Sequence, residues 1–455
     1  MITYQEYLEA AEKNDTVAFI ESSISKHKSS VEYAIAADAD QYMRKQNTTI
    51  RKFQRLVYDA AGNGVIDPVG ANFHCASGFF KQIVAQLTQT LLANGVSFKK
   101  PDTKDKLGGE LLDRQLAEVT ENALVGGISF GLFNGDKVER VFKLTEFIPM
   151  WDEVDGTLKA GIYFWQIADD KPLRADLYTL DGKQSFIRLK GEKMRLMDGF
   201  EQPQPYRLQR AVIPFDNSVL YEVAQNYPTL PIVPMYGNKQ HQSELIGLKE
   251  NIDAYDLTKC GLINDISDMP TIYWVLENAG GMSEKNLAYW RDSIRRNHVV
   301  KTDDEVKVTA NSIGVQHDAH DAVLERLEKD IYNDSMTLNT RELAAGNVTA
   351  TAVRAASDPL NNRLDELEYL VGDFVRALLA LIGVDDVPSF NRSRITNQLE
   401  EIQAIMQTAS VLDTETIIRK LPIFTPEEAE AAIQRSVAEN MDRFVEAEPE
   451  AEGEE

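Results

Sequence analysis

The hydrophobic period of the chain changes from helical to strand-like and back again, and this change constrains the fold most. In SGFFKQIVAQLTQTLLANGVSF, apolar residues recur at three- and four-residue steps, as on one helix face. ISFGLFNGDKVERVFKL instead alternates apolar and polar residues on both sides of Asn134-Gly135, which predicts a hairpin. Strand-like runs continue to about residue 235, and helical periods then return. The sequence therefore predicts an α+β, mainly helical fold that contains one β-rich module.

Helical patterns account for most of the remaining chain. Residues 1–60 show helical stretches with polar joints, AGNGVIDPVGANF after them predicts a loop, and a helix is predicted over about 108–126. A striped helix over 244–269 ends at Pro270, and another begins at residue 317. The segment between them mixes strand-like and helix-like patterns. The stripe residues are Leu245, Leu248, Ile252, Tyr255, Leu262, Ile266 and Met269 in the first helix and Val323, Leu324, Leu327, Ile331 and Met336 in the second.

A narrow apolar seam predicts one long helix later in the chain. Its members step alternately by four and three residues: Leu360, Leu364, Leu367, Val371, Phe374, Leu378 and Leu381. Such a seam is suited to packing against another long helix. RITNQLEEIQAIMQTASVL and TPEEAEAAIQRSVAENMDRF then predict short helices joined through Leu421-Pro422, and the acidic end EAEPEAEGEE is predicted to be disordered.

Acidic residues dominate the charge of this chain of 455 residues, since 72 Asp and Glu against 48 Lys and Arg leave a net charge of -24. The charge argues against a protein that grips nucleic acid by neutralising phosphates, because that grip needs a basic surface. A conduit for DNA is compatible, because an acidic wall repels the backbone at close range, and salt limits the reach to roughly 10 Å. A soluble acidic protein without such a role fits equally well.

The composition also indicates the environment in which the chain folds. A hydrophobic content of 43% is typical of a globular core, and no run approaches the roughly 18 apolar residues of a membrane span. The start, MITYQEYLEAAEKND, has no basic region followed by an apolar stretch, so no secretory signal is expected. Cys75 and Cys260 are the only cysteines and lie far apart in sequence, which excludes a disulfide framework and favours assembly in a reducing, intracellular environment.

Motifs for catalysis are absent from the sequence. The glycine pair in ENAGGMSEK lacks the Gly-Lys-Ser/Thr ending of a phosphate-binding loop, and no serine stands in G-x-S-x-G. His317 and His320 are one helical turn apart, a spacing that suits either two metal ligands or a polar first turn with Asp318 and Asp321 beside them. No second His/Cys cluster supplies further ligands. The sequence predicts no enzyme, no cofactor and no metal site.

Two other features stand out in this acidic chain. One is a basic cluster in RDSIRRN and just after it, formed by Arg291, Arg295, Arg296 and Lys301. It is either a solvated helix face or a contact with DNA or an acidic partner. The other is ELAAGNVTATAVRAA, a small and nearly uncharged break that follows an acidic helix with Asp318, Asp321, Glu325, Glu328, Asp330 and Asp334. This break is either an ordinary interhelical loop or a flexible elbow.

The order of several motifs resembles the portal proteins of long-tailed bacteriophages. An early F-x-x-I-V-x-Q-like helix of that family is matched by Phe80, Ile83, Val84, Gln86, Leu91, Leu92 and Asn94, although Gly95-Val96 stands where many relatives have a proline. Asn251–Asp256 matches a later helix, and Gly346–Ala352 matches a small-residue elbow. SVLDTETIIRKLPIFTPEEAEAAI resembles the family's ending. The resemblance spans about residues 30–440.

The resemblance implies a subunit of a homo-oligomeric ring, expected to be a dodecamer, around a channel for double-stranded DNA at one capsid vertex of the virion. The implied parts are a wing (1–60 at its periphery, 61–243), a two-helix stem (244–269, 317–340), a clip (270–316), a tunnel loop (341–352), a long helix (353–384), a helical crown (385–445) and the tail 446–455. Implied partners are a separate terminase ATPase, a head–tail adaptor, and the major capsid and scaffolding proteins. Assembly is expected in the host cytoplasm, without a membrane.

The resemblance also suggests roles for particular residues. The tunnel loop would carry Gly346, Asn347, Val348, Thr349, Ala350, Thr351 and Arg354, where small side chains and a glycine hinge keep the tip slender. Asp318, Asp321, Glu325 and Glu328 would line the channel. Arg291, Arg295, Arg296 and Lys301 would contact DNA or terminase at the clip. The alternatives are a helical scaffold or adaptor without a channel, and a metal-dependent enzyme that uses His317 and His320.

Overall fold

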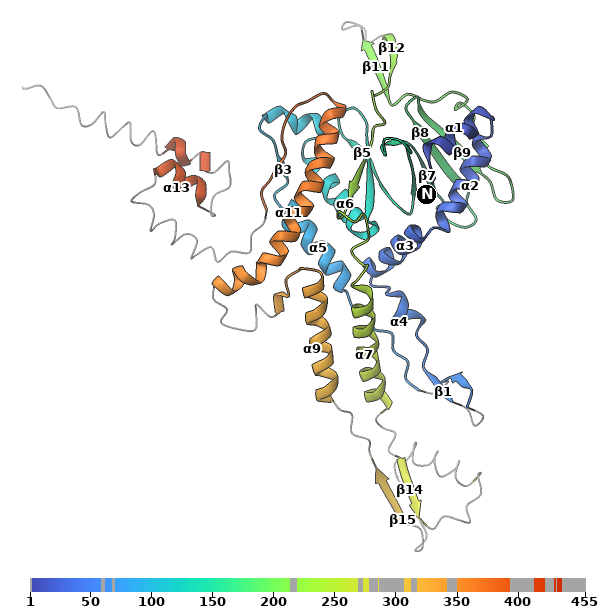
Figure 1. The fold of residues 1–455 in the computed structure, drawn as a ribbon, viewed down its shortest axis with the longest axis vertical. Helices are drawn as coiled ribbons and strands as arrows, with labels where there is room; N and C mark the ends of the chain where they lie inside the picture. The colour runs from blue at the N-terminus through green and yellow to red at the C-terminus, as the bar shows by residue number, and fades with distance from the viewer. Residues whose placement is uncertain are drawn as a thin grey trace, which may run out of the picture.

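A computed structural model describes most of the chain. The described ranges are 2–58, 62–67, 70–212, 219–268, 273–277, 285, 307–311, 317–341, 350–392, 413–421, 429–430 and 432–435. Figure 1 shows a broad upper body of sheets and helices, from which two helices descend side by side toward a strand pair at the lower end.

The β-rich module forms two antiparallel sheets in the upper body. One has five strands in the order β10-β9-β8-β7-β6, and the other has three in the order β13-β4-β5. The strands are β4 (Ile128–Phe133), β5 (Val138–Lys143), β6 (Phe147–Trp151), β7 (Leu158–Trp165), β8 (Leu173–Thr179), β9 (Gly182–Arg188), β10 (Arg195–Leu196) and β13 (Ile232–Tyr236). A separate pair, β11 (Arg207–Val212) and β12 (Val219–Gln225), projects at the top of Figure 1.

The predicted hairpin is confirmed. β4 pairs with β5, and Asn134-Gly135 begins the connection between them. Gly135 has φ of +76°, a left-handed conformation that favours glycine. β4 is buried along its whole length despite its alternating pattern, because it is the central strand of its sheet and α6 packs against it.

Helices cover these sheets, and most of the predicted helices are confirmed. The N-terminal helices are α1 (Tyr4–Glu12), α2 (Thr16–Lys28), α3 (Val31–Met43) and α4 (Thr48–Lys52), followed by α5 (Phe79–Leu92) and α6 (Glu110–Gly126). Short 3-10 turns at Pro101–Thr103 and Asp105–Leu107 precede α6. The apolar face predicted on α5 is buried in the largest core together with residues of α6 and α11.

The seam helix is α11 (Ala350–Leu381), and its predicted partner is wrong. Its seam residues from Leu360 to Leu378 are buried, but they pack against β13 and the shorter α5 instead of another long helix. Phe374 lies so close to Gly131 of β4 that a Cβ there would stand 2.7 Å from the ring. The sheet therefore provides the surface that the seam needs. α11 also begins at Ala350, so Ala350 and Thr351 are helical and do not belong to a loop.

Two antiparallel helices, α7 (Lys249–Asp268) and α9 (His317–Asp334), form the descending pair in Figure 1, which we call the stem. α7 begins later than the predicted 244, because the preceding residues turn through Gly247 at φ of +85°. The predicted stripes hold only in part: Ile266 is 45% exposed and Val323 is 47% exposed. The reason is that the lower stem is two helices wide and lacks a core like that of the body.

Small strand pairs complete the fold. β14 (Tyr273–Glu277) pairs with β15 (Lys307–Asn311) below the stem, as the mixed pattern predicted. The segment predicted as a loop after residue 60 contributes instead to a ribbon of β1 (Leu56–Tyr58) and β2 (Gly64–Ile66). β3 (Val96–Ser97) pairs with β16 (Ser389–Phe390).

Parts of the predicted C-terminal region lie outside the described residues. These are the whole of RITNQLEEIQAIMQTASVL, most of TPEEAEAAIQRSVAENMDRF, and the tail 446–455. A described helix, α13 (Thr414–Lys420), lies between the two predicted helical patterns and ends before Pro422. Within the described ranges, no helix combines the length and apolar composition that a membrane crossing requires.

Candidate functional site

One flank of α9 carries three of the predicted acidic residues. Asp318, Asp321 and Glu325 are all exposed, and their spacing of three and four residues places them on one side of the helix. Ile331, about a third of a turn away around the helix, is fully buried. Like charges at these spacings destabilise an isolated helix by about 0.2–0.5 kcal/mol per pair, while the helix dipole favours Asp318 in the first turn of α9 by a comparable amount. We call these three residues the acidic flank.

Glu328, the fourth predicted residue, is placed differently. Its side chain is 14% exposed, and a carboxylate oxygen lies 3.4 Å from Nη1 of Arg341. Asn339 donates from Nδ2 to the other oxygen over 3.3 Å. Glu328 therefore holds the chain that leaves α9 and does not belong to the exposed acidic flank.

The segment that follows α9 is also held by Gln86 of α5, a helix of the upper body. Its Oε1 accepts a hydrogen bond of 2.9 Å from the backbone amide of Leu338, and its Nε2 donates to the carbonyl oxygen of Leu338 over 3.4 Å. Leu338 is itself buried. The described chain before the predicted elbow is thus fastened to both α5 and α9.

The elbow itself lies mostly outside the described residues, which exclude Gly346, Asn347, Val348 and Thr349. The chain is described again in α11, where Arg354 is exposed one turn from the start. Most described side chains before Pro359 are exposed, whereas Leu360 and the seam beyond it are buried. Pro359 also removes one backbone hydrogen bond from the helix. The start of α11 is therefore less firmly held than its remainder.

Of two other predicted clusters, one lies wholly outside the described residues and the other is described in part. Arg291, Arg295, Arg296 and Lys301 all lie outside the described residues. His320 is half-buried in the first turns of α9, and of His317 only the backbone is described. Among the residues that the structure describes, no group of three or more His, Cys, Asp and Glu side chains is arranged to hold a metal ion.

The structure reveals a polar contact along α7 that the sequence did not predict. Side chains of α7 accept hydrogen bonds from every second backbone amide of the segment 71–78. The contacts are Asp256 Oδ1 with the Ser77 amide at 2.8 Å, Cys260 Sγ with the Cys75 amide at 3.1 Å, and Asn264 Oδ1 with the Phe73 amide at 2.8 Å. The acceptors on α7 are four residues apart, which is a rise of about 6 Å along a helix. The donor amides are two residues apart in an extended segment, which is about 6.6 Å, so the spacing of donors matches that of acceptors.

This polar ladder fixes the 71–78 segment against the stem. Asp256 and Asn264 are buried, and burial raises the pKa of Asp256 although the hydrogen bonds from Asn47 and Ser77 oppose the shift. The signal in the sequence was the recurrence of Asp256, Cys260 and Asn264 every four residues within the predicted apolar stripe. A helix with such a polar line needs a partner with free backbone donors.

A second polar cluster joins the stem to the body. Nζ of Lys249, at the start of α7, lies 3.2 Å from both Asp38 and Asp253 and 2.6 Å from the Tyr42 hydroxyl. Burial alone would lower the pKa of Lys249, but the hydrogen bond with Tyr42 and the negative charges of Asp253 and Asp38 outweigh it and raise the pKa. Lys249 therefore stays charged and ties α7 to α3.

Arg363 makes a comparable connection for α11. Its buried guanidinium donates to Glu244 over 2.6 Å and to the carbonyl oxygen of Gly237 over 3.0 Å, both just before the stem. Nη1 also lies 3.1 Å from Glu366. Removing one partner of such a buried charged network costs about 3–5 kcal/mol. Stem, sheet and long helix are thereby rigidly joined.

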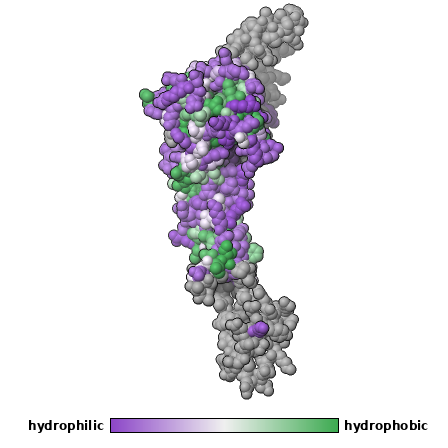
Figure 2. Space-filling view, turned by 90° about the vertical axis from the view of Figure 1, so that its right-hand side faces the viewer, coloured by the Kyte–Doolittle hydropathy of each residue, from purple (hydrophilic) through white to green (hydrophobic). Residues whose placement is uncertain are grey.

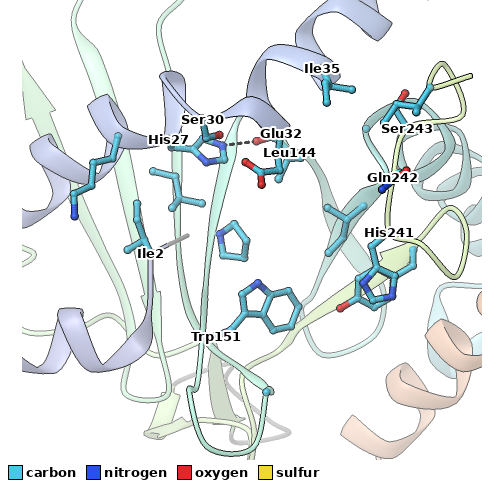
Figure 3. A pocket seen from close by; sticks show the side chains of 18 of the residues that line it. Ile2, His27, Ser30, Glu32, Ile35, Leu144, Trp151, His241, Gln242 and Ser243 are labelled. Atoms are coloured by element: carbon cyan, nitrogen blue, oxygen red, sulfur yellow. Dashed lines mark hydrogen bonds between the residues drawn. The ribbon is translucent and has the colours of Figure 1, made fainter.

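The upper body also contains a pocket of about 520 Å³ between α2, α3, β6 and the loop before α7. Figure 3 shows Trp151 and Ile2 at its apolar side, with His241 on the opposite side. His27 bonds through Nε2 to the Leu144 carbonyl oxygen at 2.7 Å, and burial lowers the pKa of this histidine. His27 is thus engaged in structural packing.

Comparison with known proteins identifies a family and two similar relatives. The family model described as "Phage portal protein, SPP1 Gp6-like" matches residues 38–442. The portal protein of Bacillus phage SPP1 is 23% identical over 428 residues, which cover 87% of this chain and 82% of that protein. The portal protein of Clostridium phage phiCD119 is 26% identical over 222 residues, or 46% of this chain and 49% of that one.

Solved structures of gene transfer agent particles contain similar chains. A chain from the neck of an empty particle has a TM-score of 0.46 and 9% identity, covering 76% of this chain and 90% of its own. One from the neck of a native particle has a TM-score of 0.42 and 11% identity, covering 82% and 96%. On the extent of the family match, the chain belongs to the SPP1 Gp6-like phage portal proteins, which are structural, non-enzymatic components of the virion.

Proposed function

We propose that this protein forms a ring of twelve identical subunits at one capsid vertex, with a central channel through which double-stranded DNA enters and leaves the capsid. In this proposal, residues 1–243 form the wing, the stem helices surround the channel, and residues 385–445 form the crown. The clip covers 270–316, where β14 and β15 extend beyond the stem.

The observation that carries the proposal is the position of the acidic flank. Asp318, Asp321 and Glu325 lie exposed on a stem helix whose exit leads directly to the predicted tunnel loop. In the ring we orient this flank toward the channel, where it repels the phosphate backbone. Each subunit would contribute negative charge to the channel wall, and the wall would discourage tight contacts with DNA over a range of roughly 10 Å in salt.

The tunnel loop would narrow the channel between two unequal supports. Gln86 and Glu328 hold the chain before it, and the chain after it enters the exposed start of α11. The small residue Gly346 would keep the loop slender, and Ala350 and Arg354 would lie at its base, in the first turn of α11. A loop held on one side and looser on the other is suited to moving while DNA passes.

DNA movement would be driven by a separate terminase ATPase, because the sequence contains no phosphate-binding loop. We place its docking surface at the clip, with Arg291, Arg295, Arg296 and Lys301 as contacts. A head–tail adaptor, the major capsid protein and the scaffolding protein are the other partners in this proposal.

Electron microscopy of the purified protein tests the ring directly. We expect closed particles with a central hole, and symmetry averaging should resolve twelve subunits. Three-dimensional reconstruction should place the acidic flank at the hole. Solitary subunits under every assembly condition would overturn the proposal and favour a scaffold or adaptor without a channel, and an acidic flank on the outer surface would overturn its orientation.

A further inference from the structure

The ribbon β1–β2 exposes an apolar surface beside the stem. Leu56 and Ile66 are cross-strand partners and are 57% and 56% exposed, and Val65 is 44% exposed. Figure 2 shows hydrophobic residues gathered near the lower end of the coloured surface, on the side where Figure 1 places this ribbon. None of these three side chains belongs to the apolar cores that the described residues form.

An isolated two-stranded ribbon is marginally stable in water at best. Burial of its apolar side chains would contribute about 25 cal/mol for each Å² removed from water. An exposed cluster of this kind marks an interaction site. The ribbon of a single subunit therefore lacks the surface that would stabilise it.

The stem has a matching surface on α9. Ala319, Ala322 and Val323 are exposed at spacings of three and four residues, next to the acidic flank, and form what we call the apolar flank. Val323 is 47% exposed. Its small side chains allow close approach of another chain. Beyond it, Arg326 is paired with Asp330 over 3.0 Å, so the charge on that side is neutralised within the helix.

The exposed charges also favour contact between the ribbon and the apolar flank of α9. Arg51 and Lys52 are exposed at the end of α4, a few residues before the ribbon. Asp318 is exposed where the acidic flank borders the apolar flank. Arg55 and Asp67 at the ribbon's base lie 3.7 Å apart and compensate one another. The exposed charges are thus basic beside the ribbon and acidic beside Val323.

The ribbon and α9 lie on opposite sides of α7 (Figure 1). In Figure 1, α7 stands between α9 and the ribbon, and the ribbon is level with the N-terminal end of α9. If the ring axis runs along the stem, rotation from one subunit to the next leaves the position of each surface along that axis unchanged. The ribbon of one copy can therefore meet α9 of the next, the head-to-tail contact that closes a ring.

We propose that β1–β2 of each subunit packs on the apolar flank of α9 in the neighbouring copy of this chain, with Arg51 and Lys52 facing Asp318. The occupant of the ribbon surface is a second copy, and this rests on the ring of the proposed function. Asp321 and Glu325 remain directed to the channel, whereas Asp318, at the border of the acidic flank, and the apolar flank form the subunit interface.

Disulfide trapping of assembled rings tests the contact. We compare Leu56→Cys/Val323→Cys with each single variant, since the native Cys260 is buried and Cys75 is half-buried. After oxidation with copper phenanthroline, the double variant should give a ladder of linked subunits on a non-reducing gel, and the single variants should stay monomeric. Rings that microscopy shows to be intact but that give no ladder would overturn the contact and leave the ring itself standing. Absence of rings in the unaltered protein would instead overturn the proposed function.

Charge exchange gives an independent readout. Arg51→Glu/Lys52→Glu should raise the protein concentration needed for half-maximal assembly about tenfold, and adding Asp318→Lys should recover most of this loss. Leu56→Asp should weaken assembly as well, because it places a charge in the apolar contact. Its matched control is Val154→Asp, at a residue that is 91% exposed in the body, which should leave assembly unchanged. Equal effects of Leu56→Asp and Val154→Asp, or no recovery on charge exchange, would overturn the proposal.

Discussion

Cys75 donates its backbone amide hydrogen to Sγ of Cys260 over 3.1 Å, although the two residues stand 185 positions apart. They are the only cysteines of the chain, and the sequence suggested no relation between them. The contact is the middle member of the polar ladder that fixes residues 71–78 to α7. This ladder connects the N-terminal part of the chain to the stem and makes the position of the β1–β2 ribbon depend on α7.

Removal of an outer member of the ladder should weaken the protein. Asn264→Ala leaves the amide of Phe73 without its acceptor, and we expect a loss of about 1–3 kcal/mol in the free energy of unfolding. Chemical denaturation measures this. Asp265→Ala is the control, because Asp265 is the exposed neighbour on the same helix. Equal stability of the two variants would contradict the structural role of Asn264.

Gln86 should control the order of the chain before the tunnel loop. Gln86→Ala removes both hydrogen bonds to Leu338, so the Leu338 amide should exchange its hydrogen about tenfold faster. Hydrogen exchange followed by mass spectrometry of peptides across 335–341 provides the measurement. Gln89→Ala, at an exposed position of α5, should change nothing there. Unchanged protection in the Gln86 variant would show that other contacts hold this exit.

Acid should release the contact between Asp386 and the loop before α6. Burial would raise the pKa of Asp386, but hydrogen bonds from the Thr103 hydroxyl and the amides of Lys100, Val387 and Lys99 lower it from 3.8 to about 2. A depressed pKa means that the contribution to stability is present above the unfolded value and is lost as the pH falls toward about 2. The free energy of unfolding of Asp386→Asn should therefore differ most from that of the unaltered protein at neutral pH. A difference in unfolding free energy that does not shrink below about pH 4 would contradict this.

Positive charge in the tunnel loop should slow DNA passage. Val348→Lys/Thr349→Lys would add phosphate contacts in the channel, and we expect the yield of packaged DNA to fall at least tenfold. Val348→Met/Thr349→Met is the control, because methionine has a similar length to lysine and carries no charge. Packaging at the unaltered level with both lysines would refute the low-friction account of the channel.

Charge reversal at the clip should separate docking from assembly. Glutamate at Arg291, Arg295 and Arg296 should weaken terminase binding in a pull-down about tenfold or more, because rim charges govern encounter with an acidic partner surface. Rings should still form, as microscopy can verify. Undiminished terminase binding would place the docking surface elsewhere.

The local pattern of apolar and polar residues determined many of the secondary structure elements of this protein. The two-residue period around Asn134-Gly135 specified the β4–β5 hairpin, the period of α5 specified its buried face, and the order of helix, mixed segment and helix specified the stem with its strand pair. These features depend on interactions between residues close in sequence, which is why the sequence contains them. The exposed spacing of Asp318, Asp321 and Glu325 followed in the same way.

Only the tertiary structure decided which surfaces these elements meet. The seam of α11 could have packed on a helix, but a sheet with Gly131 beneath Phe374 receives it. Glu328 had the same helical pattern as its acidic neighbours, yet Arg341 and Asn339 turn it into an anchor. The ladder between α7 and residues 71–78 depends on side-chain acceptors and backbone donors far apart in the chain. A periodic sequence states which face of an element is apolar or charged, whereas the partner of that face is chosen by packing and hydrogen bonding across the whole fold.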